Sequence, residues 1–361
     1  MKITLEAREV NMKVYFISSK YDGCYYVRCL LPLFHNAWDG AKRFLTQPKA
    51  SSEEMFKGAM NADIIVFQRP DTPDKTKAIE LLKRAGKKIV FDNDDTYRPD
   101  SGFPKLEMLG NKTMVEEINE ELYKNVKQAD LVTTTTDFLA QEYKPLNKNV
   151  VVLPNCIDPF DWSEPKRNKG DRVRIGLVGS VGYDDYKTIE GYLNELGERD
   201  DVQLVMFSLS KPEYVNDRVK ELYKDSYEFV EKLNIEWHSH VSMENYPDKL
   251  NSLELDIMLI PRRETYFNKC KSNVKYLEAG MLEIPVVAQS FSDGNSPYDK
   301  DLNGKNGILC STEADWKREV DNLIADKKLR RAIGKAAKKY VLKNYNIENK
   351  AKLWKEAYKT I

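Results

Sequence analysis

The stretch FNKCKSNVKYLEAGMLEIPVV, residues 267–287, contains the clearest indication of the fold. Its apolar residues recur at helical spacing over 272–282, and 284–287 form a short apolar run typical of a buried strand. A helix that leads directly into a buried strand is the repeating unit of a parallel α/β sheet. The stretch therefore predicts an α/β protein.

Similar apolar runs, separated by helical patterns, fill the rest of the chain in two groups. They lie at 13–18, 63–68, 87–92, 131–136 and 150–155, and then at 173–180, 202–208, 234–241, 256–261, 284–289 and 307–310. Between the groups, 158–172 is rich in proline and charge and has the composition of a linker. We predict two doubly wound, Rossmann-like domains, 1–165 and 166–335, which face each other across a cleft. A final helix over 336–361 is expected to pack back toward the first domain.

The composition indicates a globular protein, with 41% hydrophobic and 32% charged residues among 361. Lys plus Arg and Asp plus Glu both total 57, so there is no basic excess that would favour nucleic acid. No window approaches the ~18 apolar residues of a transmembrane helix, and the amino terminus lacks the apolar region of a signal peptide. The five cysteines form no metal-type or disulfide pattern. We expect a cytoplasmic protein without a zinc site.

Three lysines and one acid crowd the start of the 272–282 helix: Lys269, Lys271, Lys275 and Glu278. Positions 271, 275 and 278 are spaced i, i+4, i+7 and would share one helical face. Ser272 is the expected N-cap, so the next backbone N–H groups and Lys271 would attract an anion. Glu278 would accept hydrogen bonds from a diol. A nucleoside diphosphate offers both groups; the alternative is an ordinary surface pair between Lys275 and Glu278.

The longer segment FNKCKSNVKYLEAGMLEIPVVA, 267–288, resembles the donor-binding segment of GT-B glycosyltransferases, in the branch grouped with glycosyltransferase family four. That branch carries an FN-x-x-KS-x-x-K-x-x-E pattern before a helix of small residues and a PVVA strand. Other parts of the chain resemble the family in the expected order: VVVLPNCIDPFDW (150–162), RIGLVGSVGYDDY (174–186) and SPYDKDLNGKNGILC (296–310). The resemblance implies the GT-B fold, with the acceptor on the first domain and the nucleotide-sugar donor on the second.

By this resemblance, Glu278 holds the ribose hydroxyls, while Lys271 and the N–H of Ser272 face the diphosphate. Lys187 is similar to the basic residue that many relatives aim at the phosphates, which implies a catalytic role for Lys187 as well as Lys271. The whole implied donor site comprises Gly23, Gly179, Ser180, Gly182, Val241, Asn268, Lys271, Ser272, Lys275 and Glu278.

Two positions depart from the family pattern. Cys270 stands where the wider family often has an acid, and Ser180 stands where it often has an arginine. The contacts to the donor sugar are therefore not predicted. The loop 179–184 lacks the full GxGxxG of dinucleotide-binding domains, so an NAD site is not indicated.

The stretch KKIVFDNDDTYR, 87–98, places Asp92, Asp94 and Asp95 directly after a strand. Three neighbouring carboxylates repel one another, so nearby groups must offset them or use them. One interpretation is a DxD metal site, as in GT-A glycosyltransferases, although 267–288 does not belong to that fold. A second is catalysis, because Asp94 aligns with a histidine that faces the donor sugar in GT-B relatives. Capping of the next helix is a third.

The expected acceptor side lies around these acids and comprises Tyr26, Arg28, Arg69, Asp92 and Asp95. The sequence thus predicts a glycosyltransferase that moves a sugar from a nucleoside diphosphate sugar, UDP-sugar favoured, to an acceptor hydroxyl. We expect retention of configuration and no metal or other cofactor. A glycan or lipid-linked sugar is the expected acceptor, and a hydroxymethylated base of phage DNA is less favoured. Two alternatives stay open: a hydrolysing nucleotide-sugar epimerase and an inactive nucleotide-sugar-binding protein.

Overall fold

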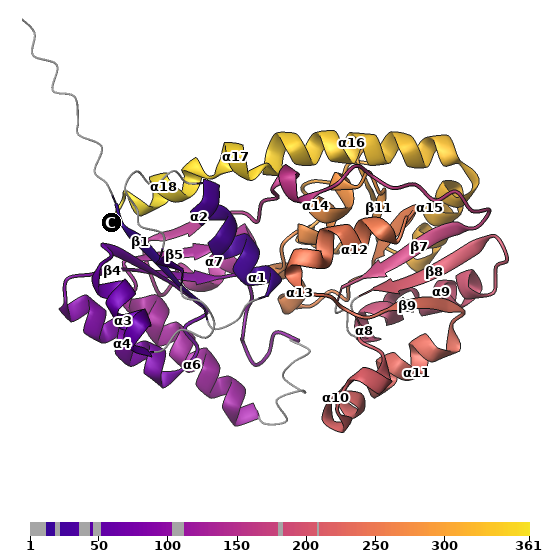
Figure 1. Ribbon diagram of the computed structural model, residues 1–361. Helices are drawn as coiled ribbons and strands as arrows, with labels where there is room; N and C mark the ends of the chain where they lie inside the picture. Colours follow the sequence, from indigo (N-terminus) through magenta and orange to yellow (C-terminus); the bar gives the residue numbers. More distant parts are fainter. Residues whose placement is uncertain are drawn as a thin grey trace, which may run out of the picture.

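The computed structural model describes residues 12–18, 22–35, 44–45, 52–102, 112–179, 183–207 and 209–361. Within these residues the chain forms two six-stranded sheets, each with helices on both of its faces (Figure 1). Every strand pairs in parallel with its neighbour. This confirms the two doubly wound α/β domains that the alternation of apolar runs predicts.

The first sheet has the order β2-β1-β3-β4-β5-β6. Its strands are β1 (Val14–Ser18), β2 (Phe44–Leu45), β3 (Ile64–Gln68), β4 (Lys88–Asn93), β5 (Leu131–Thr134) and β6 (Val150–Val152). Its helices are α1 (Gly23–Tyr25), the π-helix η1 (Tyr26–Leu30), α2 (Leu31–His35), α3 (Ser52–Met60), α4 (Pro73–Arg84), α6 (Lys112–Gln128) and α7 (Asp137–Tyr143). The register pairs Asp92 with Gln68 and with Thr133, so the carboxyl ends of β3, β4 and β5 lie side by side. The short strand β2 is not among the predicted runs.

The second sheet has the order β12-β11-β10-β7-β8-β9. Its strands are β7 (Val173–Val178), β8 (Val202–Phe207), β9 (Ile235–His238), β10 (Ile257–Ile260), β11 (Val286–Gln289) and β12 (Ile308–Cys310). Its helices are α8 (Tyr183–Tyr186), α9 (Glu190–Gly197), α10 (Asp217–Leu222), α11 (Lys224–Lys232), α12 (Tyr246–Ser252), α13 (Tyr266–Cys270), α14 (Val274–Met281) and α15 (Glu313–Ala325). The strand order reverses between β7 and β10, and ligands of open α/β sheets bind at the carboxyl end of such a reversal.

The linker and the second domain also contain single 3-10 turns outside these elements. They are η2 (Pro159–Asp161), η3 (Lys187–Ile189), η4 (Pro212–Tyr214) and η5 (Met243–Asn245). The linker that contains η2 connects β6 to β7. Oδ2 of Asp158 in this linker lies 2.7 Å from Nε2 of His35 in α2. This contact holds the start of the linker against the first domain.

Each sheet is buried on both faces because alternate residues of every strand point to opposite sides. In β1, Phe16 packs with one group of buried residues and Tyr15 with another. In β7, Ile175 and Val178 likewise belong to separate clusters. Two cores per sheet explain why the strands appear in the sequence as short continuous apolar runs.

The end of the chain connects the two domains. After α15, the helices α16 (Lys327–Tyr345), α17 (Ile347–Lys350) and α18 (Lys352–Tyr358) extend along the second domain and then the first (Figure 1). Trp354 and Tyr358 are fully buried and pack with Val14 and Phe16 of the first sheet. The predicted single helix over 336–361 is therefore the second half of α16 followed by two short helices.

Within the described part of the chain, no helix combines the length and the apolar character that crossing a membrane requires.

Candidate functional site at the domain junction

The segment that contains α13 lies directly against the first domain. The backbone N–H of Phe267 donates to the carbonyl of Ser101 at 2.8 Å, and the Thr136 hydroxyl donates to the carbonyl of Cys270 at 3.2 Å. Gly102 has a φ of +74°, and a Cβ on it would lie 3.1 Å from the Thr265 side chain. The two domains thus meet backbone to backbone where the donor segment predicted from the sequence begins.

Cys270, at the position where the wider family often has an acid, does not act as a polar group. Its side chain is fully buried and packs with Phe91 and Tyr143 of the first domain. Burial raises the pKa of this thiol far above its ordinary value. Cys270 therefore contributes to packing between the domains.

The predicted helix over 272–282 is interrupted at its start. Lys271 is extended, with φ −64° and ψ 153°, so α13 ends before it and α14 begins only at Val274. The N-cap residue is Asn273, whose side chain makes no hydrogen bond to the helix and donates to Asp301 at 2.6 Å. Ser272 was expected to be the N-cap, and that prediction is wrong. Its hydroxyl instead accepts from the Asn155 amide of the first domain at 2.9 Å.

The three lysines do not share one acid, contrary to the sequence pattern. Because Lys271 lies outside α14, it cannot share a helical face with Lys275 and Glu278. Each lysine pairs separately: Lys269 with Glu264 and Asp293, Lys271 with Asp95, and Lys275 with Glu278. Only the Lys275–Glu278 pair is local in the sequence, as its i,i+3 spacing predicts.

We call Gly179, Tyr246, Lys275 and Glu278 the second-domain cluster. Oε2 of Glu278 accepts from Nζ of Lys275 and from the Tyr246 hydroxyl, both at 2.8 Å. The ammonium also lies 2.8 Å from the Tyr246 hydroxyl and 4.7 Å from the centre of its ring, which stacks on Phe207. Burial and the adjacent carboxylate raise the pKa of Tyr246 well above its ordinary value, so its hydroxyl stays protonated and donates.

Gly179 places the end of β7 against this cluster. Its φ is +110°, which only glycine adopts without strain, and a Cβ would lie 3.1 Å from Cε of Lys275. The glycine therefore permits both the backbone turn and the approach of the lysine. The cluster lies at the reversal between β7 and β10, where a ligand is expected.

In the first domain, Arg28 and Asp92 form a buried ion pair. Nη2 and Nε of Arg28 lie 2.6 and 3.1 Å from the two carboxylate oxygens, and the Thr133 hydroxyl donates to Asp92 at 2.7 Å. The two side chains are 0% and 2% exposed, and Trp354 covers the guanidinium at 5.8 Å. The assignment of Arg28 and Asp92 to acceptor binding is wrong, because no acceptor hydroxyl reaches either group. The pair stabilises the interior.

We call Arg69, Asp94 and Asp95 the first-domain cluster. Nε of Arg69 donates to Oδ1 of Asp94 at 2.8 Å, and its Nη2 lies 3.3 Å from Oδ2 of Asp95 and 3.2 Å from the Cys24 sulfur. Burial alone would raise the pKa of Asp94, but Arg69, the Cys24 thiol and Lys271 together lower it to about 2. Asp94 is therefore a carboxylate at neutral pH.

The backbone of Arg69 is strained. Its φ is +52°, a conformation that costs a residue with a side chain about 1–3 kcal/mol. Its N–H donates to the Asp92 carbonyl at 2.9 Å, and Lys75 donates to its own carbonyl at 3.2 Å. These bonds fix the backbone in a position from which the guanidinium reaches both acids. A strained backbone that is held in place in this way is typical of a functional site.

The three acids at the carboxyl end of β4 pair with three different cations. Asp92 pairs with Arg28, Asp94 with Arg69, and Asp95 with both Arg69 and Lys271. In the part of the chain that the structure describes, no three His, Cys, Asp or Glu side chains are grouped as a metal ion requires. Each carboxylate of the DxD stretch is thus paired with a cation of the protein itself.

Asn268, expected to bind the donor, is occupied within the second domain. Its buried amide donates to the Asp185 carboxylate at 2.9 Å and to the Arg263 carbonyl at 2.8 Å. The backbone N–H of Arg263 donates to the same carboxylate at 2.7 Å. Asn268 and Asp185 thus hold the loop before α13 against α8.

The other residues predicted from sequence are dispersed around the junction. Lys187 is exposed on η3, and Val241 is half-buried beside the second-domain core. Gly23 is exposed at the first position of α1. The hydroxyl of Tyr26 is hydrogen-bonded to Asp161 of the linker. Ser180 and Gly182 lie outside the described residues.

Sequence reasoning missed Tyr246, Asn155 and Asp301. Tyr246 lies 32 positions from Glu278, and Asn155 lies 117 positions from Ser272. No spacing rule connects residues so far apart. Asn155 and Asp301 do lie inside the stretches 150–162 and 296–310. The resemblance therefore pointed to the right segments but did not identify these two residues.

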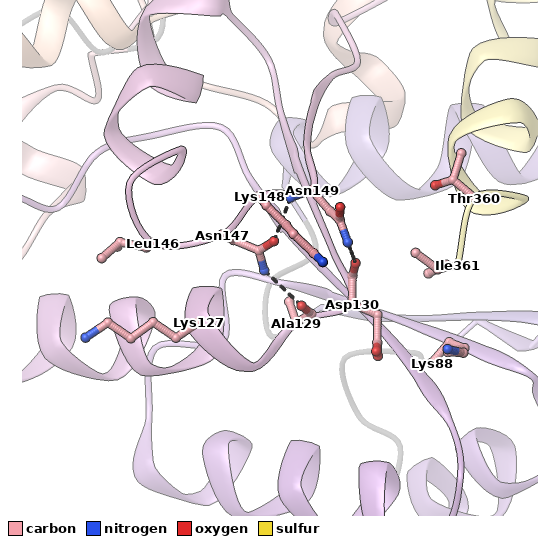
Figure 2. A pocket seen from close by; sticks show the side chains of 10 residues that line it. All are labelled: Lys88, Lys127, Ala129, Asp130, Leu146, Asn147, Lys148, Asn149, Thr360 and Ile361. Carbon is pink, nitrogen blue, oxygen red and sulfur yellow. Dashed lines mark hydrogen bonds between the residues drawn. The ribbon is translucent and has the colours of Figure 1, made fainter.

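A cavity of about 500 Å³ lies elsewhere, at the amino ends of the first-sheet strands. Figure 2 shows its lining side chains, which are Lys88, Lys127, Ala129, Asp130, Leu146, Asn147, Lys148, Asn149, Thr360 and Ile361. Lys88 is the first residue of β4, and Asn149 directly precedes β6. Because ligands of parallel sheets bind at the carboxyl ends, this cavity is not the donor site.

Residues 164–356 match the model of a family described as glycosyl transferase-like. No curated protein sequence matches the chain. Several solved structures are similar. HepE of Anabaena in complex with UDP-glucose has a TM-score of 0.66 and 14% identity, with 97% of this chain and 100% of that chain covered. A glycosyltransferase from Rickettsia africae has a TM-score of 0.62 and 14% identity, covering 97% and 99%.

A sucrose-phosphate synthase from Thermosynechococcus elongatus has a TM-score of 0.57 and 14% identity, with 88% of this chain and 80% of that chain covered. At these identities the likeness concerns the fold. The two parallel-sheet domains are arranged as in these neighbours, and the fold is GT-B, as the sequence resemblance implies.

Proposed function

Because the chain belongs to the glycosyl transferase-like family and is a glycosyltransferase, we propose that it moves a sugar from a nucleoside diphosphate sugar to an acceptor hydroxyl. UDP-sugar is the favoured donor, since HepE, a neighbour over nearly the whole chain, is seen with UDP-glucose. The observation that carries the proposal is the second-domain cluster at the strand-order reversal, with one cation and one carboxylate 2.8 Å apart.

In the proposed donor complex, Glu278 accepts hydrogen bonds from the ribose diol. Its Oε2 accepts hydrogen bonds from Lys275 and Tyr246, which orient the carboxylate. Lys275 stands beside Gly179 at the end of β7, where a Cβ on residue 179 would lie 3.1 Å from the lysine side chain. Lys271 has an extended backbone and precedes α14 by three positions. It supplies a second positive charge for the diphosphate.

The proposed reaction needs no bound metal. Negative charge grows on the diphosphate as the glycosidic bond breaks, and Lys271, Lys275 and the start of α14 offset that charge. Positive charge grows on the sugar, and ionised Asp94 on the first-domain side stabilises it. The pKa of Asp94 is about 2, which is too low for a general base near pH 7. Its proposed role is therefore to stabilise charge or to orient the acceptor. This suits transfer with retention.

A glycan or lipid-linked sugar is the proposed acceptor, and the location is proposed as cytoplasmic. A hydroxymethylated DNA base is less favoured because Lys plus Arg equals Asp plus Glu at 57 each, which gives no field to attract a polyanion. Tyr26, Arg69 and Asp95 remain the proposed acceptor side.

The test begins with wild-type protein, UDP-, GDP- and dTDP-sugars, and a panel of glycans and modified DNA. Sugar transfer with release of nucleoside diphosphate is expected, and full activity should persist in EDTA. Release of an epimer without an acceptor would indicate the epimerase alternative. Binding without any turnover would indicate the inactive binding protein.

The donor site itself is tested by Glu278→Ala. Loss of the ribose acceptor should weaken UDP binding by roughly 1–3 kcal/mol in calorimetry. Glu264→Ala is the matched control, because it removes a carboxylate from Lys269 in the same segment without touching the second-domain cluster. Equal affinity of the two variants would contradict the assignment of Glu278.

A further inference from the structure

An ion pair joins the first-domain cluster to the donor segment of the second domain across the domain junction. Nζ of Lys271 lies 2.6 Å from Oδ1 of Asp95, and the two side chains are 26% and 12% exposed. The ammonium also lies 4.2 Å from the centre of the Phe267 ring. A partly buried pair at this distance interacts more strongly than an exposed one, because less water screens it.

The two partners differ in how firmly they are held. Asp95 is fixed on the first-domain side by Arg69 at 3.3 Å and by its own N–H, which donates to Asn93 at 3.3 Å. The backbone of Lys271 is not helical and lies between α13 and α14. On its own domain the ammonium lies against the Phe267 ring, which holds a cation more weakly than a carboxylate does. The lysine is therefore the partner that can move.

We propose that Asp95 is a positioning residue that holds the Lys271 ammonium in the donor-free protein and releases it to the diphosphate of the donor. This rests on the proposed function of the site. The diphosphate of the donor would compete with Asp95 for the ammonium, and it carries more charge than a carboxylate. Asp95 is thus an internal competitor of the donor, rather than only a part of the acceptor side.

The exchange links donor binding to the charge of the first-domain side. Before binding, Lys271 and Arg69 balance Asp94 and Asp95. Once Lys271 turns to the diphosphate, Arg69 alone faces both carboxylates, and one negative charge is left unbalanced. That charge appears only when a donor is bound, and it favours the positive charge that develops on the sugar.

The test measures the affinity of Asp95→Asn and wild-type protein for UDP, GDP and inorganic pyrophosphate by calorimetry in low salt. Wild-type protein is expected to bind at least one of these probes. Loss of the Asp95 charge should increase the affinity for that probe by about three- to tenfold, and this increase in affinity should shrink in high salt. An acceptor-binding or merely structural role of Asp95 predicts no gain. Thermal unfolding of both proteins checks that the variant folds.

Asp293→Asn is the matched control. It removes a carboxylate that pairs with Lys269, in the same segment as Lys271, so its affinity should stay near the wild-type value. Unchanged or weaker binding by Asp95→Asn, or an equal gain in both variants, would overturn the inference while the proposed function stands. Wild-type protein that binds none of the three probes would contradict the proposed function and this inference together.

Discussion

The two sides of the domain junction carry similar residue types but are built differently. On the second-domain side, Lys275 and Glu278 are three positions apart on one helix. On the first-domain side, Arg28 and Asp92 are 64 positions apart, and Arg69 and Asp94 are 25 apart. The second-domain pair is local, whereas the first-domain pairs exist only because strand ends meet.

The difference shows in what each charge can do. Arg28 and Asp92 are sealed in the interior, so their energetic role is stability. Asp94 is nearly buried but lies beside residues of the junction, so its role is expected to appear in the rate. Lys275 and Glu278 are 19% and 13% exposed and remain accessible to a ligand. Substitutions should therefore separate loss of stability, loss of turnover and loss of donor binding.

The largest expected effect is on stability, for Arg28→Ala. The change leaves the Asp92 carboxylate buried without its cation, which should lower the free energy of unfolding by about 3–5 kcal/mol. Urea unfolding followed by fluorescence measures it. The control is Lys57→Ala, which breaks an ion pair whose side chains are 69% and 74% exposed and should hardly change the midpoint. A small loss in Arg28→Ala would show that the first-domain side is not built on this pair.

A smaller effect, on rate, is expected for Asp94→Asn. The amide keeps the shape and loses the charge, so turnover should fall about a hundredfold while UDP affinity holds. Steady-state rates at saturating donor measure it. Near-wild-type turnover would reduce Asp94 to a structural role.

The pH dependence of stability provides a second readout of Asp94. Its pKa is lowered in the folded protein from 3.8 to about 2, so the folded state binds this proton more weakly than the unfolded state. The resulting stability is fully present above about pH 4 and is lost as the pH falls toward 2. The stability difference between wild type and Asp94→Asn should therefore shrink over that range, as unfolding in acid buffers can measure.

The smallest of these effects is expected for Lys271→Ala. Its ammonium exchanges Asp95 for the diphosphate, so its net contribution to ground-state binding is small, and affinity for UDP should change by less than threefold. Turnover should fall by roughly tenfold, since the charge on the leaving diphosphate grows in the transition state. Equal losses in affinity and turnover would mean that Lys271 serves binding alone. No loss in either would make it an ordinary surface lysine.

Much of the fold could be predicted because parallel strands buried on both faces appear as short apolar runs. The runs at 63–68, 87–92 and 202–208 all correspond to strands. The Lys275–Glu278 pair was predictable for a similar reason, since helical spacing alone brings i and i+3 together. Ser272 misled the prediction because serine favours the N-cap position. The chain places Asn273 there and uses the Ser272 hydroxyl for a bond to the other domain.

The sequence by itself determined two doubly wound domains, the segment of the second domain that carries the lysines, and the local pair within α14. These depend on periodicity and on contacts within one helix turn, which a linear pattern contains. Tertiary structure decided that Lys271 meets Asp95, that Arg28 neutralises Asp92 and that Tyr246 completes the second-domain cluster. Those contacts depend on the register of strands and on the docking of two domains. They join residues 176, 64 and 32 positions apart, and no local rule sets such distances.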